Sequence, residues 1–342
     1  MAKRPTINDL ARASGVSVAT VDRVLNRRLP VREDTALRVV AAAEEIGYHA
    51  TGLLKQRLVE IPQRTFGFLL QKRNDEFYKH LAAELTSATR AAANIRGRAV
   101  VEFMDEIVPS MIAARINEVG MRVDALAVVA VDHPIVNEAI ANVVAHGKPV
   151  FTLLSDVTAP GRTGYLAVDS RKAGRTAAWA IFRLAKAPGK IGILLGSHRY
   201  LSQELSEISF RSYMREHAAQ FQLLEPLINL DDQRIAYEAV SDMIASNPEL
   251  AGIYVAGGGT EGVIRAMRDE QAGQRIVTVC NELMPATRAA LIDGTIDMVL
   301  ATPVVRLAAR AVDGMARACN GESHEGLTQT LFPADIYISE NI

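Results

Sequence analysis

From residue 65 onward the chain alternates between short β-rich runs and helical stretches, and this alternation limits the fold more than any other sequence feature. The β-rich runs are 66–70, 99–103, 125–131, 148–154, 190–196, 250–257, 275–280 and 297–301. The helical stretches are 77–96, 134–146, 170–187, 204–219, 235–246, 261–271 and 286–293. A strand–helix–strand repeat predicts a parallel sheet covered by helices on both faces. Because so many strands exceed one comfortable sheet, we expect two α/β lobes, with ligands at the carboxyl ends of the strands.

The first sixty residues have helical periodicity instead. Thr6 is placed to cap a first helix, with Asp9 three residues later in an arrangement like a capping box. Gly15 makes a turn, Ser17 caps a second helix, and a third helix begins near Glu33. Two short helices joined by a tight turn with glycine predict a helix-turn-helix, whose second helix enters the major groove of DNA. On this pattern alone, a plain helical hairpin is the alternative.

The second helix carries residue types that suit contact with DNA. Ser17 and Thr20 can donate to phosphates at the helix N-terminus, where the helix dipole also favours an anion. Arg23 and Asn26 are long or bifunctional donors, and the apolar tip of the helix can contact thymine methyl groups. The residues of this head that we expect to contact DNA are Thr6, Ser17, Val18, Ala19, Thr20, Arg23 and Asn26.

The charge is unevenly distributed along the chain. Residues 1–64 hold eleven Lys and Arg against seven Asp and Glu, so they carry +4, and the remainder must carry −5 to give the net charge of −1. A basic head on an acidic body suggests that the head meets a polyanion, although ordinary scatter of surface charge is the alternative. The opening "MAKRPTINDL" lacks the apolar core of a signal peptide, and two cysteines give no disulfide framework. These features predict a cytoplasmic protein that does not enter a membrane.

The stretch "TINDLARASGVSVATVDRVLN…ALRVVAAAEEIGY" resembles the N-terminal signature of the LacI/GalR family of bacterial transcriptional regulators through Tyr48. The resemblance implies an all-α helix-turn-helix head and an α/β periplasmic-binding-protein-like core of two doubly wound parallel-sheet lobes. It also implies a repressor that forms a homodimer on a pseudo-palindromic DNA operator. A small effector, expected to be a sugar, polyol or sugar derivative, would bind between the lobes. No catalytic residue, metal or cofactor is expected.

This resemblance gives the expected division of the chain. Residues 1–48 form the DNA-binding domain, residues 49–64 form a hinge or linker, and residues 65–342 form the core that binds the effector and dimerises. Within the core, the first lobe is expected to comprise about 65–162 and 294–318. The second lobe is expected to comprise about 163–293 and 319–342.

Two parts of the head depart from the family pattern. Asp22 stands where the family usually has Ser, and we expect its carboxylate to pair with Arg23 or Arg27 rather than to read a cytosine amino group. The hinge "HATGLLKQRL" lacks the Pro-Asn of the family. Either of two leucines could enter the minor groove as a wedge, with a lysine on phosphate, although core packing of the leucines is an equal alternative. These residues are Leu54, Leu58 and Lys55.

In the family, effector contacts come from strand ends, and this comparison selects nine residues here. They are Asn74, Phe77, Tyr78, Asp132, Asp156 and Asp169 in the first part of the core, and Ser206, Asn281 and Glu282 in the second. Asp169 matches a recurrent family aspartate, but it could instead cap the following helix. The alternatives are helix packing for the two aromatic residues and a helix cap for Asp132.

Three positions of the second lobe are unusual for the family. By spacing, Ser206 stands where an arginine normally clamps the effector, Asn281 replaces a histidine, and Ala301-Thr302 replace a frequent Gln-Asp. These changes imply an unusual ligand, a lost effector response or a shifted alignment.

A competing motif is "GGGTEG", which satisfies G-x-G-x-x-G through Gly257, Gly259 and Gly262, with Glu282 twenty residues later. This is the dinucleotide-binding fingerprint, although a glycine turn in any doubly wound lobe looks the same. The alternatives to the main prediction are therefore a dinucleotide-sensing regulator, an NAD-linked enzyme or an effector-independent DNA-binding protein. The pair Asp231-Asp232 is expected to be a solvated turn.

Overall fold

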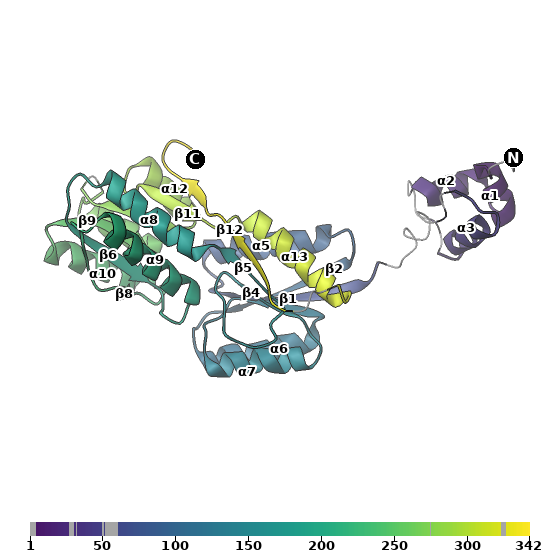
Figure 1. Cartoon of the computed structure of the whole chain (residues 1–342), viewed down its shortest axis with the longest axis horizontal. Helices are drawn as coiled ribbons and strands as arrows, with labels where there is room; N and C mark the ends of the chain where they lie inside the picture. The colour runs from purple at the N-terminus through teal and green to yellow at the C-terminus, as the bar shows by residue number, and fades with distance from the viewer. Residues whose placement is uncertain are drawn as a thin grey trace. The chain divides into compact units, whose positions relative to one another are not determined.

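The computed structural model describes residues 5–26, 31, 33–49, 51, 61–273, 275–322 and 326–342. The chain divides into two compact units, Met1–Pro62 and Gln63–Ile342 (Figure 1). We call the first unit the head and the second unit the core.

The described residues of the head form a bundle that contains three helices in the expected helix-turn-helix order. The helices are α1 (Ile7–Ser14), α2 (Val18–Asn26) and α3 (Glu33–Glu45). The capping box between Thr6 and Asp9 is formed, and Gly15 ends α1 with a φ of 65°, a left-handed conformation that glycine adopts without steric cost. Leu10, Val21 and Val39 are fully buried where the three helices meet.

The first lobe of the core is built on a six-stranded parallel sheet with the order β12-β5-β4-β3-β1-β2. The strands are β1 (Gln63–Gln71), β2 (Arg96–Met104), β3 (Ala125–Val128), β4 (Val150–Leu153), β5 (Gly164–Val168) and β12 (Thr328–Phe332). The helices are α5 (Glu76–Ala91), α6 (Pro109–Arg122), α7 (Pro134–Ala145) and α13 (Val304–Cys319).

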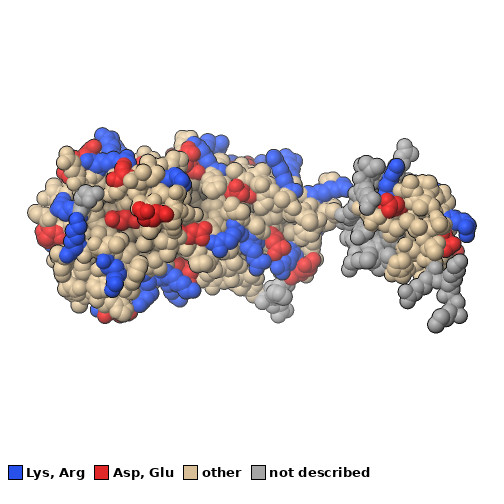
Figure 2. Space-filling view, turned by 90° about the horizontal axis from the view of Figure 1, so that it is seen from above, with Lys and Arg blue, Asp and Glu red and all other residues tan. Residues whose placement is uncertain are grey.

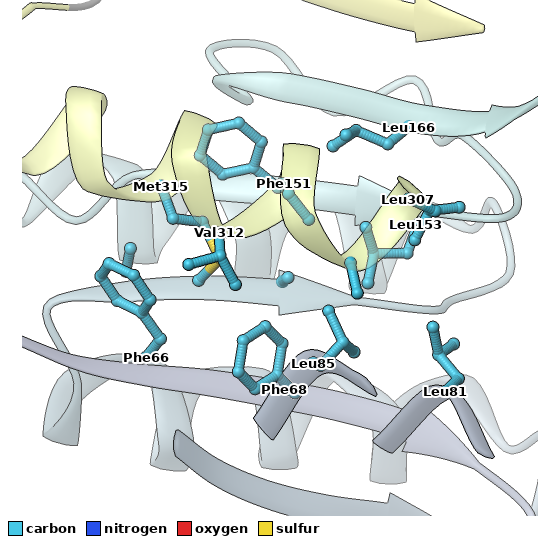
Figure 3. Close-up of a cluster of buried hydrophobic side chains, with 14 of the residues drawn as sticks. Phe66, Phe68, Leu81, Leu85, Phe151, Leu153, Leu166, Leu307, Val312 and Met315 are labelled. Carbon is cyan, nitrogen blue, oxygen red and sulfur yellow. The ribbon is translucent and has the colours of Figure 1, made fainter. Parts of the chain in front are cut away.

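Helices cover both faces of this sheet. Figure 1 shows α5 beside α13, and α6 beside α7. Each pair closes a separate apolar cluster against the sheet. In Figure 3, Leu81 and Leu85 of α5 and Leu307 of α13 meet the side chains of the central strands, among them Phe68. The carboxyl ends of the strands are thereby held in fixed positions at one edge of the sheet.

The second lobe repeats this plan. Its seven-stranded sheet has the order β13-β11-β10-β9-β6-β7, β8 pairs with β6, and only β13 runs antiparallel among the strand pairs of the described residues. The strands are β6 (Lys190–Leu195), β7 (Gln222–Leu223), β8 (Leu227–Ile228), β9 (Leu250–Val255), β10 (Val277–Asn281), β11 (Met298–Ala301) and β13 (Asp335–Tyr337). The helices are α8 (Ser170–Leu184), α9 (Leu201–His217), α10 (Gln233–Ser246), α11 (Thr260–Asp269) and α12 (Pro285–Ile292).

The chain crosses between the lobes after β5, after β11 and after β12. This differs from the expected lobe boundaries. Strands β5 (164–168) and β12 (328–332) pair with each other in the sheet of the first lobe, although both were expected in the second. Strand β11 (298–301) pairs with β10 in the second lobe, although it was expected in the first. The reason is that pairing between strands far apart in the sequence decides which lobe a strand joins.

Acidic and basic side chains are interspersed over the face of the core that Figure 2 shows. Among the described residues, no helix combines the length and the apolar character that a membrane crossing needs.

Candidate functional site

The exposed face of α2 presents the side chains that were predicted to contact DNA. Val21 and Val24 turn into the bundle, whereas Ser17, Ala19, Arg23 and Asn26 are exposed. Val18 is 41% exposed, which is unusual for a valine with a bundle beside it. This face therefore offers an apolar tip followed by a guanidinium group and an amide, a combination that can read base edges in a major groove.

The N-terminal turns of α1 and α2 are stabilised by their own side chains. The Thr20 amide donates to Ser17 Oγ at 3.1 Å, so Ser17 caps α2 as expected. Thr6 Oγ1 donates to Asp9 Oδ2 at 2.7 Å, and the Asp9 amide donates to Thr6 Oγ1 at 3.4 Å. Thr6 is thus a member of a capping box, and its hydroxyl proton is already used.

Of the two partners expected for Asp22, Arg23 forms no ion pair with it among the described residues. Instead, Asn26 Nδ2 donates to Asp22 Oδ1 at 2.6 Å, because residues four apart lie on the same face of a helix. The amide oxygen of Asn26 remains as an acceptor at the end of α2. Arg27, the other expected partner, and the hinge residues Leu54, Lys55 and Leu58 lie outside the described residues.

Within the core, a cavity of about 160 Å³ lies between the two lobes at the carboxyl ends of their strands. The first lobe contributes the ends of β1, β3, β4 and β5 and the start of α5. The second lobe contributes the starts of α8 and α9 and the segments after β8, β9, β10 and β11. This is the place that the doubly wound topology predicts for a ligand.

The lobes touch each other beside this cavity. The Asp132 amide donates to the carbonyl oxygen of Arg199 at 2.9 Å, and the Ser202 amide donates to Ser155 Oγ at 3.3 Å. Tyr200 extends from the second lobe into the apolar cluster of the first lobe and is 4% exposed. The core is therefore closed around the cavity.

The structure brings five of the nine predicted effector residues to the cavity wall. They are Phe77, Tyr78, Ser206, Asn281 and Glu282. Ser206 Oγ is 2.7 Å from the hydroxyl oxygen of Tyr254, and Asn281 Nδ2 donates to the Ala256 carbonyl at 2.9 Å. The Asn281 amide oxygen remains as an acceptor for a ligand.

The four other predicted residues do not line the cavity. Asn74 is exposed on the loop before α5. The carboxylate of Asp132 accepts from the Thr158 amide at 2.9 Å, and that of Asp156 forms an ion pair with Arg162 at 2.8 Å. Asp169 caps α8 by accepting from the Lys172 amide at 3.2 Å. Each of these carboxylates is held by a local partner, so it stabilises a turn or a helix end rather than facing the cavity.

Several wall residues were not selected from the sequence. They are Lys72, Tyr200, Gln203 and Asp231. Asp75, four residues after the end of β1, also lines the cavity, and it caps α5 by accepting from the Phe77 amide at 2.9 Å. Its position beside Asn74, after the first strand, is the sequence feature that marks it as a possible ligand contact.

Asp231 was expected in a solvated turn, and this is wrong. Its Oδ1 accepts from the Gly258 amide at 2.6 Å, and its carboxylate also hydrogen-bonds to the Gln203 side chain. Burial raises the pKa of the Asp231 carboxyl, against the effect of these hydrogen bonds and of the positive charge of Lys72. From the first lobe, Lys72 Nζ donates to the carbonyl oxygens of Leu230 and Asp231 at 3.0 and 2.6 Å. This ammonium group bridges the two lobes.

Glu282 faces the same cavity from the end of β10. Its Oε2 accepts from the Thr302 amide at 2.9 Å, and its Oε1 accepts from the Thr302 hydroxyl at 2.6 Å. Burial raises the pKa of the Glu282 carboxyl to about 7, the negative charge of Asp75 adds to this, and the bonds from Thr302 oppose it.

The glycine loop 257–262 follows β9 and begins α11, as the dinucleotide fingerprint requires. However, the Gly258 amide donates to the Asp231 carboxylate, so an internal anion lies where the fingerprint would hold a phosphate. Gly262 serves packing, because a Cβ at this position would lie 1.9 Å from the Gln233 carbonyl oxygen of the neighbouring helix. The contacts of this loop do not favour the dinucleotide alternatives.

Left-handed backbone conformations gather at the cavity. Lys72, Leu154, Asp231 and Glu282 all line it and have φ values of 41°, 64°, 52° and 67°. Such conformations cost roughly 1–3 kcal/mol each for residues with a side chain, and they concentrate at ligand sites. The strain supports this cavity as the functional site of the core.

The fold and the site together define a protein with a helix-turn-helix head and a bilobed binding core. Residues 66–323 match the family described as periplasmic binding protein domain, and residues 6–51 match the bacterial regulatory proteins of the lacI family. The chain belongs to the periplasmic binding protein domain family, and its head is a DNA-binding domain of the lacI family.

Curated relatives match the N-terminal part of the chain. The HTH-type transcriptional regulator RegA of Clostridium saccharobutylicum is 40% identical over 76 residues, and the ribose operon repressor of Bacillus subtilis is 40% identical over 77 residues. Each match covers 22% of this chain and 23% of the relative.

Solved structures match the core. An ABC transporter solute-binding protein from Agrobacterium vitis with bound α-D-tagatopyranose has a TM-score of 0.75 and 18% identity. One from Burkholderia graminis in complex with D-arabinose has a TM-score of 0.74 and 17% identity. Each comparison covers 82% of this chain and 96% of the other protein. At these identities the likeness shows the fold, and this fold is the one expected from the strand–helix alternation.

Proposed function

We propose that this protein is a transcriptional regulator whose head binds a DNA operator and whose core binds a small effector that controls the operator affinity. One observation carries the proposal: the chain joins a head whose second helix has an exposed polar face to a core with a cavity between two lobes. The relatives named as transcriptional regulators support the DNA-binding part. We further propose that it acts as a cytoplasmic repressor and binds a pseudo-palindromic operator as a homodimer.

The size and wall of the cavity support a sugar, a polyol or a sugar derivative as the effector. A volume of about 160 Å³ is close to the ~150 Å³ that holds one six-membered ring in a protein interior. Aromatic side chains and polar groups converge on it, as in sites that bind small polar rings. The solute-binding proteins of the same fold contain tagatopyranose and arabinose. No catalytic role is proposed for the core.

Control of DNA binding requires that the effector favours one arrangement of the lobes. Lys72 and the Asp132–Arg199 bond hold the lobes together beside the cavity, so a bound ligand would change the free energy of this closure. A coupling of roughly 1–3 kcal/mol between effector and operator corresponds to a change of about 5–150-fold in operator affinity.

Selection of random DNA duplexes by the full-length protein tests the head. We expect enrichment of a pseudo-palindromic sequence whose binding weakens steeply as salt is raised, because phosphate contacts release counterions. Arg23→Ala should reduce the affinity for the selected duplex by about tenfold or more. Arg38→Ala removes the same charge from the exposed face of α3 and is the matched control. Equal affinities of both variants and the wild type would contradict the assignment of α2 as the recognition helix.

A further inference from the structure

The wall of the cavity is strongly acidic. Four carboxylates line it, from Asp75, Asp231, Glu261 and Glu282, and they face one ammonium group, from Lys72. No arginine is among the described residues of this wall. A neutral sugar needs no such excess of negative charge, because the oxygen of a neutral amide side chain can also accept from its hydroxyl groups.

The single cation is already engaged. Lys72 Nζ donates to the main-chain carbonyls of Leu230 and Asp231, where it bridges the lobes. Among the described residues, no ion pair is formed by Asp75, Asp231 or Glu282. By contrast, the nearby Asp156 and Asp169, which lie outside the cavity, have Arg162 and Lys172 as partners.

Neutral donors supply the hydrogen bonds to these cavity carboxylates, and the charge of Lys72 acts on Asp231 from a distance. Asp231 is bound by a main-chain amide and an amide side chain, Glu282 by Thr302, and Asp75 by the amides that it caps. Burial raises the pKa of both Asp231 and Glu282, and the negative charge of Asp75 raises each pKa further, so Asp75 lies close enough to repel both carboxylates. A buried carboxylate without a cation is costly, and a cation from outside would relieve that cost.

The aromatic side chains of the cavity wall also suit a cationic group. Phe77 and Tyr78 stand nearly edge to face, with ring centroids 5.2 Å apart, and both line the cavity with Tyr200. Faces of aromatic rings attract cations, and this attraction strengthens where water is excluded. Carboxylates and aromatic side chains therefore line the same cavity.

We infer that the ligand of this cavity carries a protonated amine on a ring-sized polyhydroxylated frame, as in an amino sugar or an amino polyol. Its ammonium group would be met by Asp75, Asp231 and Glu282, and its hydroxyl groups by Asn281 and the other neutral polar residues. This inference rests on the proposed function of the cavity as the effector site, and it narrows the class of effector.

Calorimetric titration of the full-length protein with matched pairs tests the inference. The pairs are glucosamine with glucose, galactosamine with galactose, mannosamine with mannose, and 1-amino-1-deoxysorbitol with sorbitol. At neutral pH we expect at least one amine to bind about tenfold or more tightly than its neutral partner, since a hydrogen bond to a charged group is the stronger kind. Asp231→Asn and Glu282→Gln should each reduce that preference, whereas Asp169→Asn, outside the cavity, should leave it unchanged.

Two results would overturn the inference: neutral members that bind as tightly as the amines, or no binding by any member. The proposed function is judged separately. If a neutral sugar binds and changes the operator affinity, the proposed function stands and only the inference of an amine on the ligand is rejected. If the full-length protein selects no DNA duplex, the proposed function is rejected, whatever the cavity binds.

Discussion

Replacement of Glu282 by Gln tests whether the cavity holds an uncompensated carboxylate. Glutamine has nearly the same shape and can keep both contacts with Thr302, because its oxygen accepts from the Thr302 amide while its NH₂ group donates to the hydroxyl oxygen. The change thus removes a titratable charge with little change in packing. Its effect on stability should depend on pH, and the direction follows from the raised pKa of the Glu282 carboxyl.

The pKa of about 7 in the folded protein lies above the ordinary value of 4.5. Between these two values the folded protein holds a proton that the unfolded chain has lost. The stability contributed by this group is therefore complete below pH 4.5, decreases as the pH rises, and is lost above pH 7. At about 1.4 kcal/mol per pKa unit the loss reaches at most about 3 kcal/mol, an upper limit because the carboxyl faces the cavity.

Thermal unfolding of the wild type and of Glu282→Gln between pH 5 and pH 8 measures this difference. We expect similar melting midpoints at pH 5 and a growing advantage of the Gln variant toward pH 8, by roughly 2 °C per kcal/mol for a core of this size. Glu138→Gln, at an exposed position of α7, is the control and should follow the wild type at every pH. Parallel curves for Glu282→Gln and the wild type would refute the argument that burial without a cation raises this pKa.

Three further changes have outcomes that follow directly from the structure. Thr6→Ala removes the capping box of α1 and should cost about 1 kcal/mol, seen as faster amide exchange in that helix; unchanged exchange would contradict the cap. Gly262→Ala places a Cβ 1.9 Å from the Gln233 carbonyl oxygen, so the melting midpoint of the core should fall, and an unchanged midpoint would show that α10 and α11 can separate. Lys72→Met removes the ammonium bridge between the lobes, so hydrogen exchange of the Asp132 amide, which is bonded across the cleft, should become faster. An unchanged exchange rate would mean that other contacts hold the lobes closed.

The features that the sequence predicted well depend on residues close together in the chain. The capping box of Thr6 and Asp9 and the turn at Gly15 were both found, because caps and turns are decided within a few residues. The strand–helix alternation likewise predicted two parallel-sheet lobes. Glu282 was selected because it follows a strand directly, and strand ends converge at the ligand cleft of such a fold.

The features that the sequence did not predict depend on partners far along the chain. Asp231 reaches the cavity because the Gly258 amide binds its carboxylate and the Lys72 ammonium group binds its carbonyl oxygen. These two partners lie 27 and 159 residues away along the chain. Neither contact leaves a local signal, so the Asp-Asp pair had the appearance of a surface turn. Conversely, Asp156 has the right position after a strand, but Arg162 engages it. Aspartates that cap helices and aspartates that bind ligands look alike until their partners are known.

Coupling between the cavity and the DNA is the central claim, and one measurement addresses it directly. The affinity of the full-length protein for its selected duplex should be measured with and without a small molecule that raises the melting midpoint of the core. We expect that molecule to change the affinity by about 5–150-fold, and Asp231→Asn to diminish the change. A molecule that stabilises the core and leaves the DNA affinity unaltered would contradict the account.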